Sequence, residues 1–182
     1  MAAGKTSHVL TLALALLFWS APGSASPSAQ LDELRLVGSG EMRWLGMDIY
    51  AARLLNSAGR YDGGTITGPM ALEITYRRNI SRERLVSTTE REWRRLGREL
   101  GLAGRPHVQG WLRELGTIWP DVAPGDRIIA LVEPGGQTRF YGNAGLLGAV
   151  ADPEFGPAFL GIWLHPETRA AELRAGLLGG SQ

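Results

Sequence analysis

Apolar side chains recur at every second position in several stretches of the chain, the pattern of β-strands with one buried face. The longest such stretch, residues 42–55, carries four apolar side chains on one face: Leu45, Met47, Ile49 and Ala51. The same face, continued in both directions, also carries Arg43 and Arg53. Residues 34–38 predict a preceding strand, and the run Gly38-Ser39-Gly40 predicts the turn between the two strands.

The period changes after a third strand predicted at residues 71–77. Side chains that can face a core then recur at steps of three and four residues: Leu85, Thr89, Trp93, Leu96 and Leu100. This stripe predicts an amphipathic helix with Ser81 as its N-cap and a charged, solvated outer face. A second helix is predicted over residues 106–116. Two more are predicted near the C-terminus, starting at Asp152-Pro153-Glu154 and at Pro166-Glu167-Thr168.

Three further short strands are predicted, at residues 127–132, 138–143 and 146–150. The strands thus come in groups and do not alternate singly with helices, as they would in a parallel sheet. The pattern predicts an α+β domain in which a mostly antiparallel sheet is covered by helices.

The first residues have the layout of a secretory signal peptide. Lys5 supplies the positive charge, and the apolar run at residues 9–19 is shorter than the ~20 residues that span a bilayer. Gly23 and Ala25 fit cleavage after Ala25; a cut after Gly23 and a retained membrane anchor are the alternatives. We therefore predict a signal peptide at residues 1–25 and a periplasmic or secreted mature protein with no integral membrane span.

The remaining chain has the composition of one globular domain, predicted at residues 31–179. Lys5 is the only lysine, so 18 arginines (19 basic residues minus Lys5) balance 18 acidic residues in the mature part. This balance argues against a nucleic-acid-binding protein. The chain has no cysteine, which excludes disulfides, thiol nucleophiles and cysteine-based metal sites. The reliance on arginine, with abundant alanine and glycine, is typical of a GC-rich bacterial genome.

Common catalytic motifs are absent from the sequence: GxSxG, HExxH, the Walker A loop and GxGxxG. His107 and His165 both adjoin prolines, and neither has a carboxylate at ligand spacing. Spacing alone does not exclude a Ser-His-Asp triad, but no residue is marked as its nucleophile. We expect no cofactor and no metal, and we assign no catalytic residue.

Arg43 is the main candidate for chemistry, because a buried charge is costly unless it is paired. One interpretation is structural: Arg43 pairs with an internal acid such as Glu73, or lies near a sheet edge with its head group in solvent. The other is that it lies in an apolar cleft, where its guanidinium suits a carboxylate. Tyr50, Tyr76 and Tyr141 are candidate hydroxyl partners, although strand tyrosines are commonly half-buried structural residues.

Four segments together resemble the bacterial chalcone-isomerase-like family: GSGEMRWLGMDIYAARL, ALEITYRRNISRERLV, WPDVAPGDRI and FYGNAGLLGAVADPEFGPAFLGIWLHPETRAAELRAGLLG. The resemblance covers residues 31–179 and extends to plant chalcone isomerase and its fatty-acid-binding relatives. It implies an open-faced β-sandwich, in which a large antiparallel sheet and a helical layer enclose a ligand cleft. In the plant enzymes an early-strand arginine holds the substrate's negative charge, and in the fatty-acid-binding relatives it anchors a carboxylate.

The resemblance implies that Arg43, or Arg35 on the preceding strand, is this arginine. It also implies that the enzyme's other polar residues are replaced. The matching positions carry none of the expected residue types: Leu45 for a threonine, Arg84 or Leu85 for a tyrosine, residues 86–92 for a lysine and an asparagine, and Leu160 or Gly161 for a second threonine. Isomerase chemistry is therefore not expected from these positions.

These features favour an exported, non-catalytic protein that binds a small amphipathic carboxylate such as a fatty acid. Its candidate ligand-binding residues are Arg43, Tyr50, Arg35, Tyr76 and Tyr141. One alternative is an isomerase or lyase acting on an unsaturated or phenolic molecule, with a tyrosine hydroxyl near an arginine-lined cleft. The other is a cell-envelope interaction module, which an exposed patch formed by Trp93, Trp111 or Trp119 would favour.

Overall fold

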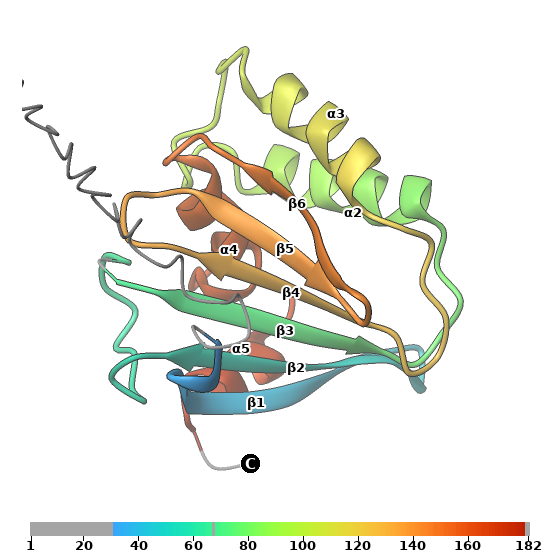
Figure 1. The fold of residues 1–182 in the computed structure, drawn as a ribbon, viewed down its shortest axis with the longest axis vertical. Coiled ribbons are helices and arrows are strands. Elements are labelled where there is room, and N and C mark those ends of the chain that lie inside the picture. Colours follow the sequence, from blue (N-terminus) through green and yellow to red (C-terminus); the bar gives the residue numbers. More distant parts are fainter. Residues whose placement is uncertain (1–30, 67, 181–182) are drawn as a thin grey trace, which may run out of the picture.

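The computed structural model describes residues 31–66 and 68–180. They form a six-stranded sheet in which each strand pairs antiparallel with the next one along the chain (Figure 1). Its strands are β1 (Arg35–Trp44), β2 (Met47–Asn56), β3 (Met70–Tyr76), β4 (Arg127–Val132), β5 (Thr138–Gly142) and β6 (Gly145–Val150). The predicted α+β class with an antiparallel sheet is confirmed. The predicted signal peptide at residues 1–25 lies outside the described residues.

The first two strands form a hairpin whose boundaries differ from the predicted ones. Gly38, Ser39 and Gly40 lie inside β1 and pair with β2, so they do not form a turn. The turn lies at Leu45 and Gly46, whose φ angles are 49° and 75°. Two consecutive positive φ angles are what a two-residue type I′ hairpin loop requires, and glycine adopts one without strain. The strand predicted at residues 42–55 is therefore two strands folded against each other.

The hairpin also buries a different face from the one predicted. Ala52 and Leu54 on β2 are buried beneath the helices, whereas Arg53 between them is exposed on the opposite face. Leu45 and Met47, both predicted on the apolar face, are exposed at the turn. The alternation with period two was correct, but alternation alone does not say which face the helices cover.

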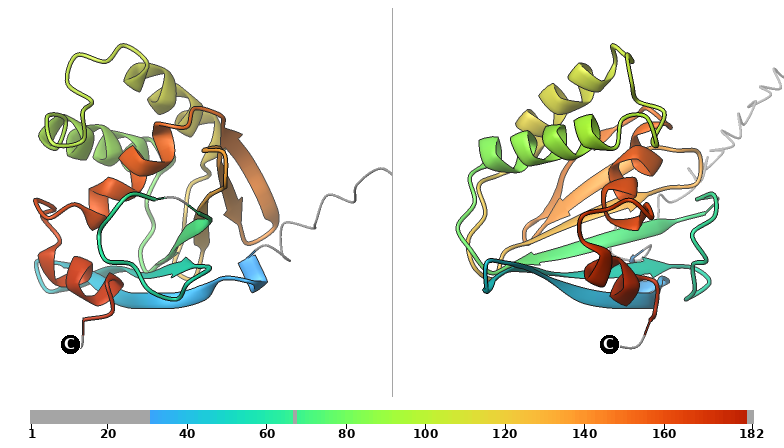
Figure 2. Two further views of the ribbon diagram at one scale, coloured as in Figure 1. Left: turned by 90° about the vertical axis from the view of Figure 1, so that its left-hand side faces the viewer. Right: turned by 180° about the vertical axis from the view of Figure 1, so that it is seen from behind.

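The described helices all lie on one face of the sheet, which curves around them (Figure 2). They are α2 (Arg82–Arg95), α3 (Val108–Ile118), α4 (Phe155–Leu164) and α5 (Ala171–Leu177). Helix α4 lies innermost, with α5 against β1 and β2 on one side and α2 and α3 toward β6 on the other. Buried side chains surround α4 on every side, as expected of a helix in the centre of a core.

Most of the predicted helix signals agree with the structure. The exceptions are that α2 ends at Arg95, so that Leu100 of the predicted stripe lies beyond the helix, and that the last helix begins at Ala171 and not at Pro166. The Ser81 hydroxyl accepts a hydrogen bond from the Arg84 backbone N–H at 3.3 Å and caps α2. Trp93 and Leu96 of the predicted stripe are buried, and α4 ends just before His165. Within residues 31–66 and 68–180, no helix has the length and apolar character needed to cross a membrane.

Candidate functional site

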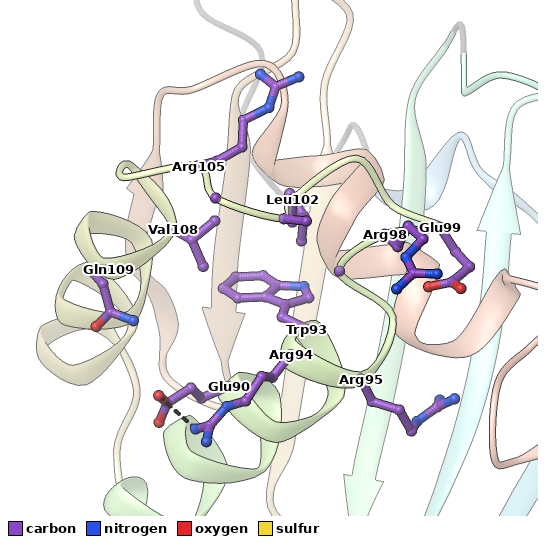
Figure 3. A pocket seen from close by; sticks show the side chains of 13 residues that line it. Glu90, Trp93, Arg94, Arg95, Arg98, Glu99, Leu102, Arg105, Val108 and Gln109 are labelled. Atoms are coloured by element: carbon purple, nitrogen blue, oxygen red, sulfur yellow. Dashed lines mark hydrogen bonds and ion pairs between the residues drawn. The ribbon is translucent and has the colours of Figure 1, made fainter.

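A groove of about 540 Å³ opens between α2 and α3, where residues 96–107 connect the two helices. Its floor is apolar and is formed by Trp93, Leu102 and Val108 (Figure 3). Its rim is charged and includes Glu90 and Arg94 from α2, with Arg98 and Glu99 from the connecting segment. The groove thus combines an apolar base with guanidinium and carboxylate groups at its opening.

The floor is rigid because the Trp93 indole is fixed from several sides. Its N–H donates a hydrogen bond to the backbone carbonyl of Ala158 in α4 at 2.9 Å. Its ring makes edge-to-face contacts with Trp111 and Phe155, at centroid distances of 5.5 and 5.8 Å. Such contacts stabilise an aromatic pair beyond the area that they bury. One side of the indole therefore belongs to the core while Trp93 also lines the groove.

The rim arginines differ in how many ion pairs and hydrogen bonds they already make within the protein. Arg94 pairs with Glu90 at 2.9 Å, and Figure 3 shows this pair at the α2 side of the groove. Arg105 donates two hydrogen bonds to the Glu154 carboxylate, at 3.0 and 2.8 Å, and points away from the floor. Arg98 makes no ion pair or side-chain hydrogen bond within the described residues. It is therefore the rim cation with the most freedom to meet an anion.

The residue types of the lining offer few groups for acid–base or nucleophilic chemistry. The groove has no histidine, serine, threonine, tyrosine or cysteine among its lining residues, so it offers neither an imidazole base nor a hydroxyl nucleophile. Its acids are Glu90, which is paired with Arg94, and Glu99 on the rim. No group of three potential metal ligands occurs in the described residues. An apolar floor beside free positive charge suits an amphipathic anion.

Two of the five candidate residues predicted from sequence, Tyr50 and Tyr76, lie together between the sheet and the helices. They face each other in the β2–β3 register, with ring centroids 6.2 Å apart. The Trp163 indole N–H donates a hydrogen bond to the Tyr50 hydroxyl at 2.8 Å. Burial raises the pKa of Tyr50 to about 12 and raises that of Tyr76 further. Both hydroxyls are thus neutral near pH 7, and aromatic rings fill this part of the interior.

The other three candidates lie elsewhere. Arg43, near the β1–β2 turn, is exposed and pairs with Glu41 at 2.8 Å and with Asp48 at 2.9 Å. These hydrogen bonds, to Asp48 first, raise the pKa of Arg43. Arg35 is exposed at the opposite end of β1. Tyr141 is buried on the other face of the sheet, in a small cluster with Ala71, Ile129 and Leu131.

Arg43 therefore lies near a sheet edge with its head group in solvent, as one of the two structural interpretations expected. Its ion-pair partners are Glu41 and Asp48. Glu73, the acid suggested from sequence, pairs with Arg53 at 3.3 Å and with Arg127 at 3.7 Å. The structure does not bring an arginine of β1 next to the tyrosine pair. Whether any of the five residues binds a ligand stays a prediction.

The groove residues were not found from the sequence, because the charged face of α2 has the pattern of an ordinary solvated surface. The only available signal was Trp93 on the buried stripe, followed by Leu102 and Val108 beyond the helix end. That signal predicts core packing as readily as a groove. The pairing of α2 with α3 is what leaves these three side chains around an opening.

Comparisons with known proteins agree with the fold. Residues 24–179 match the family model described as chalcone isomerase-like. An uncharacterised protein of Haemophilus influenzae is 30% identical over 158 residues, a match that covers 86% of this chain and 72% of that protein. The crystal structure of an Arabidopsis thaliana fatty-acid-binding protein superposes with a TM-score of 0.60 at 15% identity. That superposition covers 81% of this chain and 87% of the plant chain. The chain therefore belongs to the chalcone isomerase-like family.

Proposed function

We propose that this protein binds a small amphipathic carboxylate, such as a fatty acid, in the groove between α2 and α3. The observation that carries this function is the combination of an apolar floor, formed by Trp93, Leu102 and Val108, with a rim arginine, Arg98, that has no ion-pair partner among the described residues. The volume of about 540 Å³ is within the ~300–1,000 Å³ typical of small-molecule sites. The apolar tail would lie over Val108 and the small accessible parts of Leu102 and Trp93, and the head group would meet a guanidinium.

Three further features support a binding role. The structurally similar plant protein is named for fatty-acid binding. The groove lining lacks the imidazole and hydroxyl groups that acid–base or nucleophilic chemistry would use. No tyrosine lies at the arginine rim, whereas the isomerase or lyase alternative requires a tyrosine hydroxyl beside an arginine-lined cleft. The signal-like N-terminus adds export to the periplasm to this proposal.

The interaction-module alternative requires exposed indoles at Trp93, Trp111 or Trp119. All three side chains are buried. Trp93 and Trp111 make edge-to-face contacts with Phe155, and Trp119 packs on Phe140. These residues hold the helices on the sheet and do not form a patch for a partner.

The first test is to denature the purified protein and identify co-purified lipid by mass spectrometry. The second is to titrate a long-chain fatty acid and follow tryptophan fluorescence and the melting temperature. Arg98→Gln should weaken binding about tenfold or more, because a hydrogen bond to a charged group contributes ~1.5–3 kcal/mol. Arg91→Gln is the matched control, since Arg91 is an exposed arginine of the neighbouring helix α2 and does not line the groove.

The same titration with Arg43→Ala and Arg35→Ala tests the two anchors suggested by the family resemblance. Under the groove proposal, both variants bind the acid as the wild type does. The absence of both co-purified acid and any stabilisation by added fatty acid would contradict the binding function. If Arg43→Ala or Arg35→Ala lost binding while Arg98→Gln bound normally, the protein would still be a binding protein, but its site would lie at that arginine and not in the groove.

A further inference from the structure

The tip of the β1–β2 hairpin exposes a run of apolar side chains that nothing in the described residues covers. Leu45 is 82% exposed and Trp44 60% exposed, and Met47 on the other side of the turn is also exposed. The indoles of Trp93, Trp111, Trp119 and Trp163 are buried. Trp44 is thus the single exposed tryptophan of the described chain, and it lies next to the most exposed leucine.

The tip is also the place where the backbone accepts an unfavourable conformation. Leu45 is the only residue other than glycine with a positive φ in the described chain, at 49°. A type I′ turn favours asparagine, aspartate or glycine at this position, and leucine there is unusual. Leucine is therefore unfavourable at position 45 for two reasons: the turn requires a positive φ, and the apolar side chain is exposed to solvent. Strain of this kind is found where a side chain serves a function.

A polar collar surrounds the base of the tip. Arg43 bridges the two strands of the hairpin through Glu41 and Asp48, and Arg77 joins Glu41 from β3's end at 2.9 Å. The next residue, Arg78, is exposed and makes no ion pair within residues 31–66 and 68–180. Two carboxylates thus pair with two guanidinium groups, and Arg78 adds a further positive charge beyond the end of β3.

A second apolar side chain lies at the same end of the sheet. Leu146, which is exposed, follows the β5–β6 turn, and the antiparallel order places that turn at the same end as the β1–β2 turn (Figure 1). Three strand spacings separate β2 from β5, a distance of roughly 15 Å along the sheet. Two separate convex tips fit a broad surface better than one pocket on a partner protein.

We infer that this end of the sheet docks on a lipid bilayer, with Trp44, Leu45 and Met47 entering the interfacial region. Tryptophan prefers that region, and arginine side chains behind the tip lie at the level of the phosphates. The three exposed side chains offer on the order of 300–400 Å², less than half of the ~800 Å² per partner that a stable protein interface buries. Shallow insertion of apolar side chains has no such requirement. This surface is distant in sequence from the α2–α3 groove, and its role does not depend on a ligand there.

The absence of cysteine allows a direct test in the full chain. A single cysteine introduced as Leu45→Cys and labelled with the polarity-sensitive dye NBD should brighten and shift to the blue when vesicles of phosphatidylethanolamine and phosphatidylglycerol are added. The matched control is Leu36→Cys with the same dye, because Leu36 is also exposed on β1 but lies at the opposite end of the strand. The apolar run at residues 9–19 is common to both proteins, so a difference between them reports on the tip.

Trp44→Ser, made in the labelled Leu45→Cys protein, should raise the vesicle concentration at half-maximal signal about tenfold or more. Circular dichroism and a urea unfolding curve should be unchanged, because Trp44 is outside the core. The inference is overturned if the dye at residue 45 does not respond, if the dye at residue 36 responds equally, or if Trp44→Ser has no effect. A response at residue 45 to protein concentration alone would also overturn it, since that indicates a second copy on the tip.

Discussion

Replacement of Gly38 by alanine should destabilise the protein, because the backbone of β1 approaches the end of α5 closely at this residue. A methyl group at Gly38 would lie 2.6 Å from the Gly179 nitrogen and 2.7 Å from the Leu177 carbonyl oxygen, and closer still to the Gly176 carbonyl oxygen. All three atoms belong to the backbone, so no side-chain rotation relieves the overlap. Helix α5 would have to move away from the strand.

The expected cost follows from what α5 buries. Leu173 and Leu177 are almost completely buried, and burial of a leucine side chain contributes ~1.5–3 kcal/mol. If the displacement of α5 exposes about half of each side chain, the loss is roughly 1.5–3 kcal/mol. Alanine recovers up to ~1 kcal/mol through the lower entropy of the unfolded chain. The net expectation is a destabilisation of about 1–2 kcal/mol, or a melting temperature lowered by roughly 2–8 °C.

Two other glycines provide controls in the same urea and thermal unfolding assays. In Gly40→Ala the new methyl group meets the flexible Leu173 side chain at 2.9 Å, so the cost should be smaller than in Gly38→Ala. In Gly116→Ala, within α3, it meets nothing within 4 Å. That variant should be stabilised by ~1 kcal/mol through helix propensity. Gly38→Ala as stable as the wild type, or less harmful than Gly40→Ala, would refute the close-approach argument.

Tyr50→Phe should lower stability by ~1 kcal/mol near neutral pH, because the Trp163 N–H loses its acceptor. The same variant should reduce the alkaline loss of stability. The pKa of Tyr50 is about 12 in the folded protein, above its ordinary value near 10, so its contribution is complete below pH 10 and declines by ~1.4 kcal/mol at about pH 11. Urea midpoints measured at both pH values check this, and an unchanged slope with pH would contradict it. Leu45→Asn should stabilise the protein by ~1 kcal/mol, because asparagine suits the positive φ of the turn. A lower urea midpoint in Leu45→Asn would show that the leucine packs on the hairpin.

Long periodic segments were the part of the fold that the sequence predicted well. The stripe through Trp93 and Leu96, the Ser81 cap and the helix break before His165 involve neighbours along the chain, and the structure has all three. Only the last residue of the predicted stripe, Leu100, lies beyond the end of α2. Propensity and capping act over three or four residues, so a local pattern is enough to detect them. The grouping of strands likewise indicated the antiparallel sheet.

The hairpin at β1 and β2 was mispredicted because glycine has two uses that look alike in a sequence. Gly38 and Gly40 lack side chains so that β1 can approach α5, whereas Gly46 supplies the positive φ of the turn. Only the first use depends on a segment more than a hundred residues away. A leucine before Gly46 further hid the turn, because leucine is not a turn residue.

The candidate site could not be predicted for a similar reason. The sequence shows that Arg94 and Arg98 are charged and that Trp93 is on the buried stripe, but an opening exists only where α3 packs against α2. For the tyrosines, the sequence indicated the correct pair but not the partner of their hydroxyl groups. The strand register brings Tyr50 and Tyr76 together. The Tyr50 hydroxyl, however, accepts a hydrogen bond from Trp163, which lies in a helix far along the chain.

The position of Leu45 gives a physical reason why a catalytic hydroxyl at residue 45 would not contribute to a cleft in this chain. The resemblance aligned Leu45 with a catalytic threonine, but residue 45 is the apex of a turn and is 82% exposed. A hydroxyl placed there would face solvent, where water competes for every hydrogen bond and an oxyanion gains little from it. Side chains that do face the interior from this hairpin, among them Tyr50 and Leu54, are part of the core or pack against it. The same turn that removes residue 45 from the interior gives Trp44 and Leu45 the exposed position from which they can reach a lipid surface.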